Sequence, residues 1–163
     1  MKIKDQFRNC KNGIKNLITW FTVIWKDRDW DQQFFYEIVY FKLKQMEKFH
    51  RNYGNTVNRE KYADEIKLAA LLLKRVIDDN YLENVMEPHE KKWGESDFVF
   101  TPLPDNKNLS SLSIKVEKAN TPEEIKKEHK ERMTLYQHSD HLKKQDLDMF
   151  FKHVRKYVEG WWD

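Results

Sequence analysis

The sequence predicts a mainly α-helical protein, a helical bundle of four to five helices with one long irregular insertion. Apolar residues recur at three- and four-residue spacing over long segments, which is the period of one helix face. The helix breakers Pro88, Gly94, Pro102 and Pro104 gather instead between residues 80 and 120. A chain of 163 residues is long enough for one such domain, and we expect residues 1–163 to form it.

The first two helices are expected on either side of a charged break. An apolar stripe predicts the first helix over residues 4–25. The stripe restarts at Trp30 and continues to Gly54, a residue that often ends helices. Either Asp27 or Asp29 is suited to cap the second helix, because a carboxylate accepts hydrogen bonds from the first free N–H groups.

The third helix has the most regular pattern of the chain. Apolar residues keep the helical period from Tyr62 to Ile77, and Thr56 or Asn58 can cap the start. The helix is expected to stop near Asp79, where the pattern ends.

The insertion and the last helix follow. Residues 80–120 are expected to be mostly irregular, although Phe98–Phe100 and Leu112–Val116 have the composition of a short β-hairpin. Thr121–Glu124 has the Thr, Pro and Glu order of a capping box. It predicts the start of a long C-terminal helix, with a bend around Ser139–Asp140.

Composition excludes several classes of protein. There are 30 basic and 27 acidic residues, and a net charge of +3 is too small for a protein that coats long nucleic acids. The single cysteine, Cys10, cannot form an internal disulfide, and no apolar run approaches the roughly 20 residues of a membrane span. We therefore expect a cytoplasmic protein with no membrane or long nucleic acid as partner.

The first candidate ligand-binding segment is the charged break itself. Trp25 and Trp30 flank Arg28, which is set among three aspartates. Indole rings stack on bases, and a guanidinium binds phosphate with two parallel hydrogen bonds. The alternative is structural: the aspartates cap the second helix, Arg28 pairs with one of them, and both indoles are buried.

The second candidate segment is His89–Glu95 in the insertion. Trp93 would stack on a base, while His89 and Lys92 would reach its phosphate. The alternative is an ordinary solvated loop of mixed charge.

No catalytic or metal site is expected. Three pairs of residues have the spacing of known metal sites, but each lacks its required companions or a helix to hold it. In particular, Pro88 is expected to interrupt a helix that would carry Glu87 and Glu90. The pairs are Glu47 with His50, Glu87 with Glu90, and Glu128 with Glu131.

The aromatic C-terminal segment and the apolar stripes favour self-association. Trp161 and Trp162 must either pack into the core of the chain or bind a partner, because exposed indoles are costly. The stripes of the first and last helices add more apolar surface than a small bundle hides. We therefore expect a homo-oligomer.

Several motifs together resemble a widespread family of small bacteriophage proteins. The resemblance spans nearly the whole chain and is carried by these segments: Trp25–Asp31, Lys42–Met46, His89–Glu95 and Trp161–Asp163. Some phage proteins of this general size are anti-CBASS sponges, to which this chain is similar. Such proteins bind a cyclic nucleotide immune signal, such as 3′3′-cGAMP, and withhold it from the defence of the host.

The resemblance implies an anti-defence protein of the host cytosol that binds a cyclic nucleotide without cleaving it and needs no cofactor. Its ligand contacts would come from the two candidate segments, at Trp25, Arg28, Trp30, His89, Lys92 and Trp93. Two alternatives stay open: a magnesium-dependent helical nucleotide pyrophosphatase, and a phage inhibitor that binds a host protein.

Overall fold

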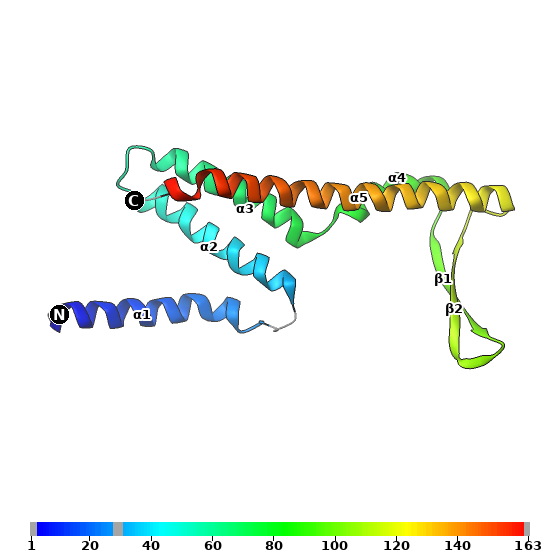
Figure 1. The fold of residues 1–163 in the computed structure, drawn as a ribbon, viewed down its shortest axis with the longest axis horizontal. Coiled ribbons are helices and arrows are strands. Elements are labelled where there is room, and N and C mark those ends of the chain that lie inside the picture. Colours follow the sequence, from blue (N-terminus) through cyan, green and yellow to red (C-terminus); the bar gives the residue numbers. More distant parts are fainter. Residues whose placement is uncertain (1–2, 28–30, 162–163) are drawn as a thin grey trace. The chain divides into compact units, whose positions relative to one another are not determined.

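The computed structural model describes residues 3–27 and 31–161, and it is mainly α-helical with one small two-stranded antiparallel sheet (Figure 1). The predicted fold class is therefore confirmed. The chain divides into two compact units, Met1–Ile77 with Met149–Asp163, and Asp78–Asp148. The expectation of a single domain stays a prediction.

The first unit contains three helices from the first half of the chain: α1 (Ile3–Ile24), α2 (Gln32–Tyr53) and α3 (Arg59–Asp78). Gly54 ends α2 as predicted. The N-cap of α2 is Asp31, whose carboxylate accepts a hydrogen bond from the Gln33 N–H at 2.9 Å. The expectation that Asp27 caps this helix was wrong, because α2 begins later than its apolar pattern does, and Asp29 lies outside the described residues.

The core of the first unit is built around α3. Ile66, Leu73 and the alanines between them are buried and pack against Leu43 of α2. The core also includes Phe150 of α5 (Pro122–Tyr157) and Trp161, which follows the 3₁₀-helix Val158–Gly160. The Trp161 indole N–H donates to Glu65 Oε2 at 3.1 Å, so this indole packs into the core of its own chain.

The second unit begins with a helix where irregular structure was predicted. After Asp79, which turns the chain with a positive φ of 51°, α4 runs from Tyr81 to Trp93 and contains Pro88. The prediction that Pro88 interrupts this helix was wrong. A proline removes one backbone hydrogen bond at a cost of about 3 kcal/mol, but Tyr81, His89 and Trp93 of α4 are buried, and this packing outweighs the local cost.

The predicted hairpin is present. Strands β1 (Ser96–Leu103) and β2 (Asn106–Val116) pair antiparallel, with Phe98 opposite Ile114 and Phe100 opposite Leu112. These four side chains therefore share one face of the ribbon, because side chains alternate along a strand. The expectation that residues 80–120 are mostly irregular was wrong, since α4 and this hairpin occupy most of them.

Helix α5 begins at the predicted capping box. Thr121 Oγ1 accepts from the Glu124 N–H at 3.2 Å, and the Glu124 carboxylate accepts from the Thr121 N–H at 2.9 Å. The helix then continues without interruption for 36 residues through Ser139, where a break in direction was predicted. The Ser139 hydroxyl donates to the Tyr136 carbonyl of the preceding turn at 2.9 Å, as serine side chains inside helices often do.

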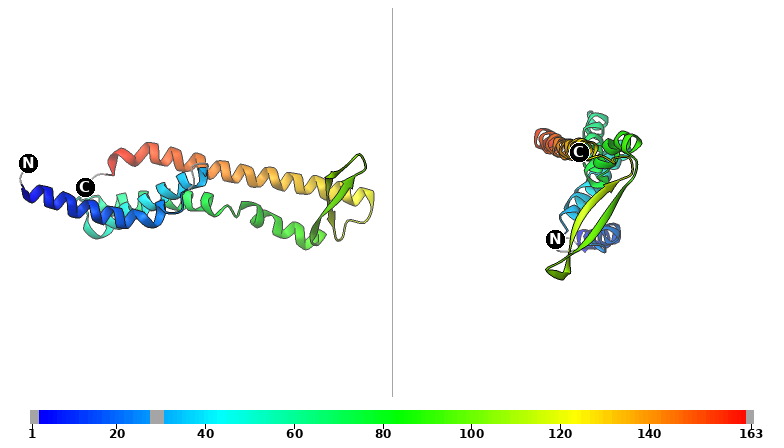
Figure 2. Two further views of the ribbon diagram at one scale, coloured as in Figure 1. Left: turned by 90° about the horizontal axis from the view of Figure 1, so that it is seen from below. Right: turned by 90° about the vertical axis from the view of Figure 1, so that its right-hand side faces the viewer.

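Within the second unit, α4 lies beside the first part of α5, and the hairpin leaves the end of α4 and returns to the start of α5 (Figures 1 and 2). In the described ranges, no helix has both the length and the apolar composition needed to cross a membrane.

Candidate ligand-binding site

A groove of about 650 Å³ runs between α4 and α5 in the second unit. This volume falls within the usual range for small-molecule sites, roughly 300–1,000 Å³. Apolar side chains form much of its wall, and lysines surround them. Its lining consists of Val85, Pro88, His89 and Lys92 from α4, and of Lys127, Lys130, Glu131, Thr134 and Leu135 from α5.

The charge of the groove is mostly positive, with three ammonium groups against one carboxylate. Lys92 is paired: its ammonium donates to both oxygens of Glu131 at 2.8 and 2.7 Å. Hydrogen bonds from Lys92 and then from the Trp93 indole lower the pKa of Glu131, so this carboxylate is held ionised. Lys127 and Lys130 are exposed on the same helix as Glu131, and the charge of Lys127 also contributes to the lowered pKa of that carboxylate. Because both side chains are exposed, their ammonium groups are accessible to an anion from solution.

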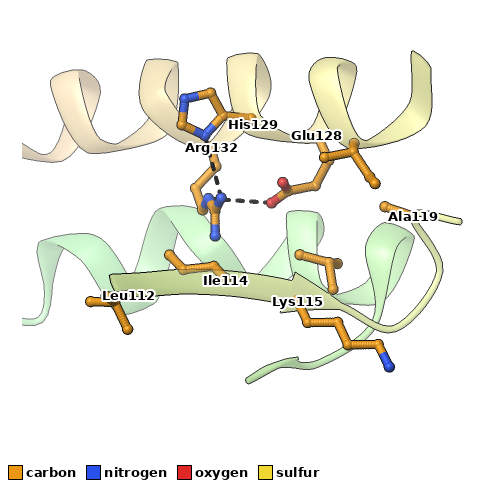
Figure 3. A pocket seen from close by; sticks show the side chains of 9 residues that line it. Leu112, Ile114, Lys115, Ala119, Glu128, His129 and Arg132 are labelled. Atoms are coloured by element: carbon orange, nitrogen blue, oxygen red, sulfur yellow. Dashed lines mark hydrogen bonds and ion pairs between the residues drawn. The ribbon is translucent and has the colours of Figure 1, made fainter. Parts of the chain in front are cut away.

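A second cavity, of about 410 Å³, lies between strand β2 and α5 (Figure 3). Ile114 of β2 points toward α5 (Figure 3), and Leu112, Val116, Ala119 and Ile125 add further apolar wall. Glu128 and Arg132 reach into this space from α5 (Figure 3). The cavity is thus mostly apolar, and the charged side chains of its lining are Lys115, Glu128 and Arg132.

Glu128 and Arg132 belong to a buried cluster. Arg132 Nε lies 3.3 Å from Glu128 Oε1, and Arg132 Nη2 lies 3.4 Å from His129 Nδ1. His89 of α4 approaches the same carboxylate, with Nε2 3.6 Å from Glu128 Oε1. The side chains of Arg132, Glu128 and His89 are only 3–7% exposed. Glu128 and Arg132 of α5 thus form an ion pair removed from water, and His89 of α4 lies against it.

This cluster is not fully satisfied. Arg132 Nη1, Glu128 Oε1 and His89 Nε2 are buried without a hydrogen-bond partner of good geometry. Burial of such groups costs free energy, and packed apolar side chains of the same volume would often be as stable. The ionic cluster is thus a weak source of stability next to the groove.

Three of the six predicted contact residues lie together in the second unit. His89 and Lys92 line the groove, with Lys92 engaged by Glu131. Trp93 is buried in a small core with Val116 and Ala119, and its indole N–H donates to Glu131 Oε2 at 2.7 Å. In this structure the ring of Trp93 is part of the core and is not accessible for stacking on a base.

The other predicted contacts belong to the first unit or lie outside the described residues. Trp25 is 71% exposed and contacts Phe21 of its own segment. Arg28 and Trp30 lie outside the described residues. Their predicted role stays a prediction.

Four glutamates of the three pairs, Glu47, Glu87, Glu128 and Glu131, interact with cations or hydrogen-bond donors. Glu47 accepts hydrogen bonds from Lys44 at 2.6 Å and Arg51 at 3.4 Å, while Glu128 and Glu131 face the groups described above. Among the residues that the structure describes, no three His, Cys, Asp or Glu side chains are grouped so as to hold a metal ion.

Sequence reasoning missed Lys127 and Lys130 as candidate contacts. Their three-residue spacing places them on one face of a helix. The sequence has many lysines, however, and most lysines simply lie on the surface of a protein. The apolar partners across the groove, which distinguish these two lysines, come from α4 and are visible only in the folded unit.

Comparison of the chain with models of protein families, with curated proteins and with solved structures gave no match. The resemblance to phage anti-CBASS proteins therefore stays a prediction.

Proposed function

We propose that this protein binds a cyclic nucleotide, such as 3′3′-cGAMP, in the groove between α4 and α5 and sequesters it without cleavage. The observation that carries the proposal is the position of Lys127 and Lys130 beside an apolar wall in a groove of ligand size. Ammonium groups bind phosphate as point charges, and a base has a flat apolar face. A cyclic dinucleotide has two phosphates and two bases, which match both features.

The carboxylates near the groove support sequestration over hydrolysis. Glu131 is occupied by Lys92 and Trp93, and Glu128 by Arg132, so each acid already neutralises a cation or accepts a donor. A sponge needs affinity and no general base. The resemblance of the sequence adds the biological role, an anti-defence protein in the cytosol of a phage-infected host.

Lysine variants inside and outside the groove test its role. Replacing Lys127 and Lys130 with Gln should weaken binding of 3′3′-cGAMP by at least about 100-fold, because each charge-assisted hydrogen bond contributes roughly 1.5–3 kcal/mol and 1.4 kcal/mol is one decade. Lys126→Gln is the control, since Lys126 is exposed on the same helix but does not line the groove. Calorimetric titration measures the affinity of the wild type and of both variants. Equal affinity in all three proteins, or no binding by the wild type, would refute the proposal.

The fate of the ligand separates the sponge from the pyrophosphatase alternative. The protein is incubated with labelled 3′3′-cGAMP and magnesium, denatured, and the nucleotide is recovered and analysed. A sponge returns the nucleotide intact, whereas linear or monomeric products would identify a hydrolase.

The hairpin favours the second alternative, an inhibitor that binds a host protein. Phe98, Phe100 and Leu112 share one face of the ribbon and are more than half exposed. A protein inhibitor would lose its protection of the phage in Phe100→Ser and keep it in the Lys127→Gln, Lys130→Gln variant. The sponge predicts the reverse pattern in the same infection assay.

A further inference from the structure

Helix α1 presents a long apolar face to solvent. The face consists of large side chains that are between 48 and 75% exposed, although their sequence pattern is that of a buried helix face: Phe7, Ile14, Leu17, Phe21 and Ile24. Monomeric proteins rarely expose so continuous an apolar strip, and strips of this kind mark interaction sites.

The spacing of this face is that of a coiled-coil seam. Phe7, Ile14 and Phe21 recur every seven residues, as do Cys10, Leu17 and Ile24 three positions later. These are the a and d positions of three successive heptads. We call these six residues the α1 seam. A helix of 22 residues is about 33 Å long, so the seam extends along most of it.

The contacts of α1 within its unit use a different face. The Trp20 ring packs edge-on against Phe41 of α2, with the ring centroids 5.1 Å apart. Thr22, Val23 and Lys26 line a small cavity with residues of α2 and α3. The seam therefore stays exposed while α1 is held by its opposite side.

We propose that the α1 seam binds the α1 seam of a second copy of this chain, as an antiparallel pair. In this register Phe7 packs against Ile24 of the partner subunit, and Ile14 packs against the partner's Leu17. Cys10 then lies beside Phe21 of the partner subunit. Because the arrangement has twofold symmetry, each contact occurs twice and the interface closes as a dimer.

The distribution of charge selects the antiparallel arrangement. The basic residues of α1 all lie at or before Lys15, whereas residues 16–24 carry no charge. A parallel pair would place the two basic segments side by side, and like charges there are destabilising. The antiparallel pair places each basic segment along the uncharged segment of its partner and toward the partner's Asp27.

A regular heptad seam favours a second helix over a lipid surface. Helices that lie on membranes have a wide apolar sector with a period of 3.6 residues and no requirement for a 3.5-residue repeat. The α1 seam keeps the heptad spacing through three repeats, which allows its side chains to interlock with those of another helix.

Cysteine cross-linking tests the register, because Cys10 is the only cysteine of the chain. In the proposed pair the two Cys10 residues are eleven residues apart along the axis, about 16 Å, too far for a disulfide. Mild oxidation should leave the wild type uncrosslinked. It should convert the Phe21→Cys variant into a covalent dimer, in which Cys10 of each chain is joined to the introduced thiol of the other.

Asn16→Cys, on another face of α1, is the control for this cross-link. Its introduced thiol points away from the seam, so mild oxidation should leave the variant uncrosslinked. A disulfide between the two Cys10 residues in the wild type would overturn the antiparallel arrangement. The arrangement would also be overturned if the Phe21→Cys variant formed a covalent dimer no faster than the Asn16→Cys control.

Light scattering on the 163-residue chain tests the seam itself. The wild type should have twice the 20.0 kDa mass of the chain. The Leu17→Asp variant should have the mass of one chain. The Asn12→Asp variant is the control with the same added charge, and it should stay a dimer. Leu17 is 69% exposed, so its replacement should leave the α3 core folded. A thermal melt of the Leu17→Asp monomer checks this. A monomeric wild type overturns the proposal, and so does a dimer that persists in Leu17→Asp. Seam-dependent binding of a monomeric wild type to phosphatidylglycerol vesicles would identify a lipid surface instead.

This dimer is independent of the proposed ligand. The Lys127→Gln, Lys130→Gln variant should keep the dimer mass, and its loss of nucleotide affinity concerns the groove alone. Failure of either experiment therefore leaves the other proposal intact.

Discussion

Trp93 and Trp25 have opposite environments in the structure. Trp93 is 7% exposed and bonds to Glu131, whereas Trp25 is 71% exposed. Trp93→Ala should therefore lower the free energy of unfolding by about 3–5 kcal/mol, the usual cost of removing a large buried aromatic side chain. Urea denaturation measures this cost, and Trp25→Ala is the matched control, with an expected change near zero. A loss of nucleotide affinity in Trp93→Ala without loss of stability would show instead that the ring contacts the ligand.

Glu128 and Arg132 form the other residue-scale test. Removing one partner of a buried ion pair leaves an uncompensated charge, so Arg132→Met alone should cost about 3–5 kcal/mol. The double variant Glu128→Leu, Arg132→Met removes both charges and should be close to the wild type in stability. A double-mutant cycle by chemical denaturation measures the coupling. Additive losses would contradict the assignment of a coupled pair.

At the scale of single elements, the capping box of α5 makes stability depend on pH. Hydrogen bonds from the Thr121 and Asn120 N–H groups lower the pKa of Glu124 below its ordinary value of 4.5. A depressed pKa stabilises the folded state above the unfolded pKa, and this contribution is lost as the pH falls through the folded pKa. The stability difference between wild type and Glu124→Gln should therefore shrink as the pH falls below 4.5.

Urea denaturation at a series of pH values checks this dependence. Glu123→Gln is the control, because Glu123 lies in the same first turn of α5 and no capping hydrogen bond involves it. A difference that does not change with pH, or one of the same size in Glu123→Gln, would contradict the capping role of Glu124.

At the scale of the whole molecule, the proposed sponge should bind its ligand without a divalent metal. The positive charge of the groove comes from lysine side chains, and its carboxylate Glu131 is already paired. Affinity for 3′3′-cGAMP should be unchanged by EDTA and should decrease with salt, because exposed charges are screened. Calorimetric titration in both conditions is the measurement. Affinity that disappears in EDTA and returns with magnesium would favour the hydrolase alternative.

The sequence by itself determined the features that depend on local chemistry. The capping box at Thr121, the end of α2 at Gly54 and the period of α3 follow from short-range hydrogen bonds and from the spacing of apolar side chains. The hairpin was also predicted from its composition. These features need only a few neighbouring residues, so the sequence contains nearly all the information that specifies them.

Tertiary structure alone decided the features that depend on distant partners. Helix α4 forms through Pro88 because Tyr81 and Trp93 find partners in α5 and the hairpin, and that gain exceeds the local cost of proline. The same contacts bury Trp93, which was predicted from the sequence to contact a ligand. They also place Lys127 beside the apolar wall of a groove. The pattern along one helix shows which residues share a face. Whether that face is buried, and which residues lie opposite it, depends on packing between segments that are far apart in the chain.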